Sequence, residues 1–159
     1  MAALVTQGRM QLRVEFVDWA AAEPAIRTIR KAVFVCEQAV PEELEWDGLD
    51  PLCAHVLAWN DVGEAIGTAR MRADGTIGRM AVLKDWRGRG IGRALLQRLV
   101  DLASRRGLSR VTLAAQIHAL RFYERAGFHT VSDPFMDAGI PHRLMVKELL
   151  LPQAGREGR

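Results

Sequence analysis

The segment Arg87-Gly88-Arg89-Gly90-Ile91-Gly92-Arg93 lies between a stretch that favours a strand and one that favours a helix. Glycines lack a Cβ, so the backbone can approach a ligand closely and direct several N–H groups to one point. The N-terminus of the following helix adds about half a positive charge, and each arginine adds a whole one. The segment therefore suits a pyrophosphate, although a purely structural strand-to-helix turn would have the same appearance.

Two common phosphate-binding loops do not match this segment. A dinucleotide-binding fingerprint needs a third glycine at the position of Arg93 and an acidic residue about 20 residues further on, and residues 111–116 contain none. A P-loop needs a Gly-Lys-Ser/Thr triplet, which the sequence lacks. NAD and ATP are therefore not expected in those binding modes.

Outward from the loop, hydrophobic periodicity predicts a mixed α/β fold. Alternating apolar residues indicate strands, and apolar residues at helical spacing indicate helices that cover the sheet. The expected strands are 11–17, 54–59, 64–71, 76–82, 110–115, 128–132 and one within 143–149. The expected helices are 20–36, 91–106 and 119–126, with one short turn within 41–51. With 159 residues and no internal repeat, we expect a single domain over 1–159, with its core at 11–149 and a flexible tail at 153–159.

Charge is unevenly divided along the chain. The formal net charge is only +3, which is too little to indicate a nucleic-acid-binding protein by itself. Residues 32–69 contain eight acidic residues and no Lys or Arg, whereas residues 70–125 contain 13 basic and four acidic residues. One part is thus suited to cations and the other to anions, unless both are simply solvated faces.

No metal site, signal peptide or membrane span is indicated by the sequence. Cys36 and Cys53 lack metal-ligand spacing and are expected to be small buried residues in a reducing compartment. No apolar stretch approaches the roughly 20 residues that cross a bilayer, and residues 1–11 lack the apolar run of a signal peptide. We therefore expect a cytoplasmic protein without a metal.

The glycine loop and a second motif further along the chain together resemble a known protein family. Arg87-x-x-Gly90-x-Gly92 follows residues 78–82, and Gln116-x-x-Ala119-x-x-x-Tyr123-Glu124-Arg125-Ala126-Gly127-Phe128 follows the next expected strand. In this order the two blocks resemble the coenzyme A site of the GNAT superfamily of N-acetyltransferases, over roughly residues 11–149. A narrower similarity, to the small bacterial ElaA-like and YjcF-like branch, rests on residues 33–38, on Glu45-x-Asp47-x-x-Asp50 with His55, and on residues 139–142.

The resemblance implies a mostly antiparallel sheet in which strands 76–82 and 110–115 form a splayed parallel pair. The pantetheine arm of the co-substrate acetyl-CoA would enter the gap between them. The residues expected to contact it are Met80, Ala81, Val82, Arg87, Gly88, Arg89, Gly90, Ile91, Gly92, Arg93 and Gln116. Gln116 stands where many family members have Asn, so its amide is one methylene further from the backbone.

The resemblance also implies direct attack on the acetyl thioester by an amine of a small molecule or peptide. Tyr123 would be the general acid that protonates the departing thiolate, because a free thiol has a pKa of about 8.5 and needs only modest help. A carboxylate or histidine is expected to receive the proton of the amine. The candidates are Glu37, Glu45, Asp47, His55 and His142, with His118 as a weaker one, although each can also be an ordinary polar residue. The acidic stretch 32–69 would attract a cationic amine.

Other functions and an oligomer stay open at this point. A non-catalytic module that senses acyl-CoA would share the loop, and a Tyr123→Phe variant that loses turnover but keeps binding would separate the two. A nucleic-acid module is disfavoured because Phe122 and Tyr123 are the only adjacent aromatics and a CoA accounts for much of the positive charge. We expect neither nucleic acid nor membrane as a partner. Dimers are common among proteins that resemble this one, and an edge strand at 143–149 would supply an interface.

Overall fold

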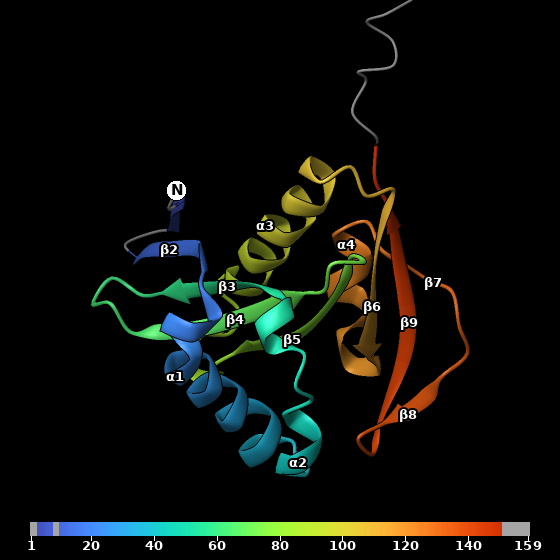
Figure 1. Cartoon of the computed structure of the whole chain (residues 1–159), viewed down its shortest axis with the longest axis horizontal. Helices are drawn as coiled ribbons and strands as arrows, with labels where there is room; N and C mark the ends of the chain where they lie inside the picture. Colours follow the sequence, from blue (N-terminus) through green and yellow to red (C-terminus); the bar gives the residue numbers. More distant parts are fainter. Residues whose placement is uncertain (1–2, 8–9, 151–159) are drawn as a thin grey trace, which may run out of the picture.

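The computed structural model describes residues 3–7 and 10–150 (Figure 1). In these residues one nine-stranded sheet has the order β1-β2-β3-β4-β5-β6-β9-β7, and β8 pairs with β9 beside this path. The β5–β6 pair is parallel and the other pairs are antiparallel. The strands are β1 (Ala3–Gln7), β2 (Met10–Val17), β3 (Ala54–Trp59), β4 (Ala65–Met71), β5 (Thr76–Val82), β6 (Arg110–Gln116), β7 (His129–Thr130), β8 (Phe135–Asp137) and β9 (Ile140–Glu148).

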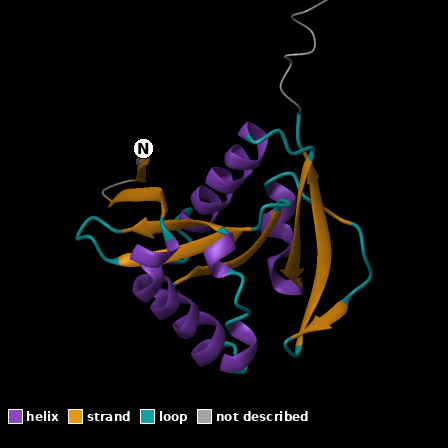
Figure 2. Ribbon diagram, viewed as in Figure 1, coloured by secondary structure: helices purple, strands orange, loops and turns teal. Residues whose placement is uncertain are grey.

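Helices cover both faces of this sheet (Figure 2). On β3, Val56 and Ala58 pack in the core under α3, whereas Leu57 packs in the core under α1, because successive side chains of a strand point to opposite faces. The structure is therefore a sheet between two helical layers, a mixed α/β fold as predicted. The helical segments are α1 (Trp19–Arg30), η1 (Lys31–Glu37), α2 (Glu42–Glu45), η2 (Asp50–Leu52), η3 (Lys84–Trp86), α3 (Ile91–Arg105), η4 (Ile117–Ala119) and α4 (Leu120–Arg125).

The two long helices form where their sequences favour them. Asp18 caps α1, because its Oδ2 accepts a hydrogen bond from the Ala21 N–H at 3.3 Å. Helix α3 buries an apolar stripe that includes Ile91, Leu95 and Leu99, all at most 1% exposed. This stripe lies on the sheet beside β5, so the N-terminus of α3 is fixed next to the C-terminal end of that strand.

Strands β5 and β6 separate after a short parallel pairing, as predicted. Thr76 pairs with Thr112 and Ile77 with Leu113, and the pairing stops there. Arg79 then adopts a φ of +47°, which is uncommon for a residue other than glycine, and the register of β4 against β5 shifts at this point. The bulge turns the end of β5 away from β6 and opens a gap between the two strands (Figure 1).

Some elements differ from the predictions. Strands β1 and β8 were not predicted, and residues 31–37 form a π-helical segment rather than further α-helix. Strand β9 begins at Ile140 and lies between β6 and β7, so the expected edge strand at 143–149 is an inner strand. Strands β6, β7 and β8 all pair with β9, so both of its edges have hydrogen-bonded neighbours. The expected tail at 153–159 lies outside the described residues.

The cysteines also differ in part from the prediction. Cys53 is half-buried, and its Sγ donates a hydrogen bond to the Leu49 carbonyl at 3.3 Å. Cys36 is exposed, so the prediction that it is buried is wrong. The reason is the π-helical winding of η1, which turns Val33 into the core and leaves Cys36 on the outer side. Among the described residues, no helix has the length and apolar character needed to span a membrane.

Candidate active site

Two adjoining cavities open where β5 and β6 separate. The sheet cavity, of about 720 Å³, lies between η1, the ends of β5 and β6 and the turn from β8 to β9. The loop cavity, of about 530 Å³, lies at the N-terminus of α3 and against α4. The two share a set of lining residues at their junction, namely Met80, Val82, Arg87, Ala119 and Tyr123.

The glycine loop gives the loop cavity an uncapped helix N-terminus. Gly88 and Gly90 have φ values of +76° and +80°, and Gly90 is the N-cap of α3 without a side chain that could accept from the first N–H groups. A Cβ on Gly88 would meet open space, whereas one on Gly92 would lie 3.3 Å from Phe122 Cζ. The loop therefore keeps a free backbone face toward the cavity, which suits an anion such as a pyrophosphate.

The arginines near this helix N-terminus differ in whether they line the cavities. Arg93 and Arg125 line the loop cavity, and Arg87 lines both cavities. Arg89 lines neither cavity; its guanidinium carbon lies 4.8 Å above the ring of Trp86. The other residues expected to contact the cofactor each line at least one of the two cavities.

Tyr123 stands at the junction of the cavities. Its hydroxyl donates a hydrogen bond to Met80 Sδ at 3.7 Å, and its ring makes edge contacts with Phe122 and Phe128. Burial raises the pKa of Tyr123 to about 12. The hydroxyl is therefore protonated at neutral pH, and it donates to Met80, which lines both cavities.

The predicted proton acceptors are divided between two places. Glu45, His118 and His142 line the sheet cavity, whereas Asp47 and His55 line neither cavity. His142 Nδ1 lies 2.6 Å from the Ile140 carbonyl oxygen. Because a carbonyl only accepts, Nδ1 carries a proton, so Nε2 is the ring nitrogen of His142 that is left for another partner.

His55 is enclosed by its neighbours. Its Nε2 lies 2.8 Å from the Asp50 carbonyl oxygen and therefore carries the proton, and its ring stacks on Trp19 at 4.9 Å. Burial lowers the pKa of His55, so the ring is neutral. Only 2% of the residue is exposed, which leaves no path to a substrate in either cavity.

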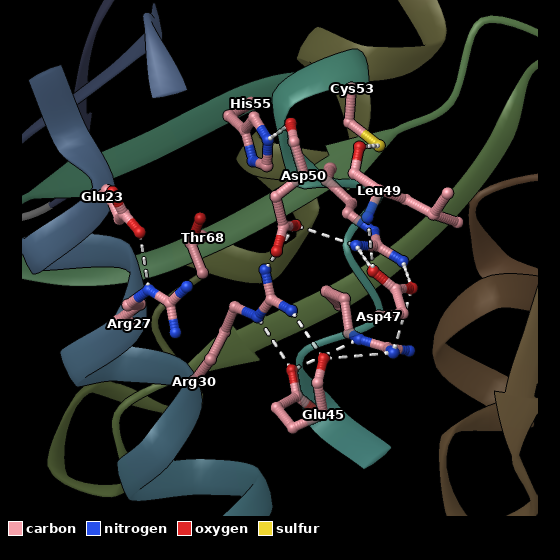
Figure 3. A network of polar contacts seen from close by, with 12 residues as sticks. Glu23, Arg27, Arg30, Glu45, Asp47, Leu49, Asp50, Cys53, His55 and Thr68 are labelled. Carbon is pink, nitrogen blue, oxygen red and sulfur yellow. Dashed lines mark hydrogen bonds and ion pairs between the residues drawn. The ribbon is translucent and has the colours of Figure 1, made fainter. Parts of the chain in front are cut away.

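A buried ion network takes up three of the eight acidic residues of 32–69 (Figure 3). The Arg30 guanidinium lies between two carboxylates, with Nε 2.8 Å from Glu45 Oε2 and an Nη 2.7 Å from Asp50 Oδ1. Asp50 also accepts from Arg70 at 2.8 Å, and Arg79 Nε lies 3.2 Å from Glu45 Oε2. The network balances three cations against three anions, namely Arg30, Arg70, Arg79, Glu45, Asp47 and Asp50.

Burial and hydrogen bonding shift these carboxyl groups in different directions. Burial raises the pKa of Glu45, and the hydrogen bond from Arg30 only partly offsets it. Burial would also raise the pKa of Asp50, but hydrogen bonds from Arg30 and Arg70 outweigh it and lower that pKa. The Arg70 hydrogen bond holds the pKa of Asp47 well below its usual range. Of these carboxyl groups, only Glu45 combines a raised pKa with a place in the wall of the sheet cavity.

Two further ion pairs involve the acidic stretch. Glu37, at the end of η1, holds the Arg87 guanidinium at 2.7 and 2.9 Å, and Glu42 lies 3.7 Å from Lys31. Five of the eight acidic residues of 32–69 therefore have a cationic partner inside the protein. Little of the negative charge expected to attract a cationic amine is left unpaired.

Sequence reasoning missed Gln38, which closes one side of the sheet cavity. Its amide exchanges two hydrogen bonds with that of Gln116, at 2.8 and 3.2 Å. Gln38 directly follows the π-helical segment, and Ala39 behind it has a φ of +57°. Neither feature has a local sequence signal, so the pairing could not be read from the chain alone.

Comparison with known proteins agrees with this geometry. Residues 21–149 match the family described as the acetyltransferase (GNAT) domain. The uncharacterized N-acetyltransferase YjcF of Bacillus subtilis is 37% identical over 124 residues, which are 76% of this chain and 88% of YjcF. A solved acyl-CoA N-acyltransferase of Pseudomonas aeruginosa is 32% identical with a TM-score of 0.75, over 86% of this chain and 99% of that one. The structure of Escherichia coli ElaA is 28% identical with a TM-score of 0.76, over the same shares.

A splayed parallel strand pair beside an uncapped, glycine-rich helix N-terminus defines a transferase that holds a coenzyme A thioester. The chain belongs to the GNAT family of acyl-CoA N-acyltransferases. The family resemblance predicted from the sequence is thereby confirmed, including the similarity to YjcF and ElaA.

Proposed function

We propose that this protein transfers an acetyl group from acetyl-CoA to a primary amine of a small molecule or peptide, with Tyr123 as the general acid. The observation that carries the proposal is the position of Tyr123, which lines both cavities and whose hydroxyl bonds Met80, a residue that also lines both. The loop cavity has the charge and the backbone N–H groups to hold the pyrophosphate, and the sheet cavity would admit the pantetheine arm and the acceptor amine where β5 and β6 separate. Acetyl-CoA, when bound, supplies the activated thioester.

The chain has groups of the right kind for each part of the donor. The N-terminal N–H groups of α3, with Arg93 and Arg125 beside them, would hold the pyrophosphate. The backbone of residues 80–82 has no partner on β6, so it would hydrogen-bond the pantetheine arm. Gln116 would offer one amide N–H from the other strand.

The reaction is a direct transfer. The amine nitrogen bonds to the carbonyl carbon, the carbon–sulfur bond breaks, and the sulfur leaves as a thiolate. Tyr123 supports this step by donating its hydroxyl hydrogen bond to the developing thiolate. Its pKa of about 12 keeps the hydroxyl protonated, so that it is available as a donor to the sulfur at neutral pH.

His142 is the acceptor for the proton that the amine loses. Its Nδ1–H is held by the Ile140 carbonyl, so Nε2 would be the atom that accepts the proton, and His142 lines the sheet cavity. Glu45 lines the same cavity, but its Oε2 is already shared between Arg30 and Arg79. His142→Gln should therefore lower kcat/KM for the amine, whereas His129→Gln, on the exposed strand β7, should leave it unchanged.

Thiol release from acetyl-CoA in the presence of primary amines tests the proposal. Tyr123→Phe keeps the ring contacts and removes only the hydroxyl, so kcat should fall about 10²- to 10⁴-fold. Calorimetric binding of acetyl-CoA should be unchanged in the same variant. Undiminished kcat in Tyr123→Phe would contradict the role of the hydroxyl. Binding of acetyl-CoA without thiol release for any amine would instead favour a sensing module.

A further inference from the structure

Two consecutive side chains at the end of η1 hold two of the residues expected to contact the cofactor. Glu37 pairs with Arg87, and Gln38 pairs with Gln116. Segment η1 lies on the sheet-cavity side, whereas Arg87 precedes the glycine loop on the other side. The Glu37–Arg87 contact thus connects the two cavities through side chains.

The Arg87 guanidinium already forms three hydrogen bonds within the protein. Its two terminal nitrogens donate to the two oxygens of Glu37 at 2.9 and 2.7 Å, and its Nε donates to the Val82 carbonyl at 2.9 Å. Three of the five N–H donors of the arginine are therefore in use. A guanidinium offers two edges of paired N–H groups to a carboxylate or a phosphate, one formed by its two terminal nitrogens and one by Nε and a terminal nitrogen. Glu37 occupies the first edge and the Val82 carbonyl takes Nε of the second, so a phosphate that binds through two N–H groups has to displace one of them.

The pair is nevertheless easy to displace. The side chains of Arg87 and Glu37 are 42% and 34% exposed. An ion pair in contact with water is weak, because solvent and salt screen it and two long side chains must be ordered to form it. A pyrophosphate held by several N–H groups of α3 can therefore take Arg87 from Glu37.

We propose that Glu37 competes with the cofactor pyrophosphate for Arg87, and so weakens the binding of coenzyme A and speeds its release as product. This inference rests on the proposed function, because it needs coenzyme A in the loop cavity. Glu37 is then a positioning residue that acts through Arg87. Its removal should tighten binding, which is the opposite of what the loss of a binding or purely structural residue would do.

Calorimetric titration of the unaltered protein and its variants with coenzyme A tests this prediction. Glu37→Gln keeps the size of the side chain and removes its charge, and should lower the Kd about two- to fivefold, a range that corresponds to a surface ion pair. Since affinity differences within one site lie mostly in dissociation, the dissociation rate should fall by a similar factor. Glu43→Gln removes a nearby exposed charge without a partner in the structure and should leave the Kd unchanged.

The double variant separates competition for Arg87 from a long-range charge effect. In the Arg87→Gln background, Glu37→Gln should no longer change the Kd, because there is no guanidinium to compete for. An equal or weaker affinity in Glu37→Gln would overturn the proposal, and so would a gain that persists without Arg87. If the unaltered protein bound no coenzyme A, the proposed function itself would fail, and that result is distinct from either of these.

Discussion

Gln38 and Gln116 join the two sides of the active-site cleft by a reciprocal pair of amide hydrogen bonds. Gln116 ends β6 and Gln38 follows η1, 78 residues earlier in the chain. Each amide both donates and accepts, at 2.8 and 3.2 Å. Because β5 and β6 are paired only at Thr76–Thr112 and Ile77–Leu113, this contact holds the far end of the cleft at a defined width.

Loss of either amide should destabilise the protein and loss of both should cost less than the sum. Gln38→Leu or Gln116→Leu leaves the partner without its hydrogen bonds in a half-buried site, which costs about 1 kcal/mol. The double variant removes both partners, so the two effects should not add. Urea unfolding measures them, with Gln97→Leu as control because Gln97 bonds only an exposed Asp101. Additive losses of unfolding free energy would mean that the two amides are not energetically coupled.

Tyr123 is the only tyrosine in the chain, so its ionisation can be followed directly. In the folded protein the phenolate absorbance should appear with a midpoint near pH 12, because burial raises the pKa of Tyr123 to about 12. In urea the midpoint should return to about 10. The native state holds this proton more tightly, so stability should fall as pH rises above about 10. A midpoint near 10 in protein that is still folded by circular dichroism would show that the hydroxyl is open to water.

A substitution in the buried ion network should lower the stability of the protein far more than a substitution in a surface ion pair. Arg30 is 1% exposed and serves both Glu45 and Asp50, so Arg30→Met removes the cation that these two buried carboxylates share, leaves only Arg79 and Arg70 beside them, and should cost about 3–5 kcal/mol. Lys31→Met removes an exposed pair with Glu42 and should cost less than about 1 kcal/mol. Chemical unfolding of both variants gives the comparison. Equal losses would contradict a buried role for the network.

The sequence predicted those parts of the fold that depend on local pattern. Strands β3 and β5 have the predicted bounds, and α3 ends within one residue of its predicted end. Alternation, helical spacing and the glycines define these elements without help from distant residues. The family of the protein followed from the same segments, because the glycine loop and Tyr123 lie on contiguous motifs.

The electrostatics of the site depend on contacts between distant residues and were not predicted. Residues 32–69 contain no Lys or Arg, so the acidic stretch was interpreted as a field for a cationic substrate. In the fold, Arg79 and Arg30 approach Glu45 from 34 and 15 residues away and cancel most of that field. The bulge at Arg79 has no sequence signal either, because a positive φ is uncommon for a residue other than glycine and arginine does not indicate it.

The buried His55 makes stability depend on pH near neutrality. Burial lowers its pKa in the folded state, whereas an unfolded histidine has a pKa of about 6.5. Below about pH 6.5 the unfolded chain therefore binds a proton that the folded protein does not, so this contribution to stability is present above that pH and is lost as pH falls. The slope is at most about 1.4 kcal/mol per pH unit for one group.

Urea unfolding at pH 7 and pH 5 tests this contribution by difference. His55→Gln keeps an N–H donor for the Asp50 carbonyl and removes the titration, so the loss of stability between the two pH values should be smaller than in the unaltered protein. Glu45, whose pKa is raised by burial, titrates in both proteins and cancels in the comparison. His118→Gln, an exposed position, should leave the loss unchanged. An equal loss in His55→Gln would show that another group sets the pH dependence.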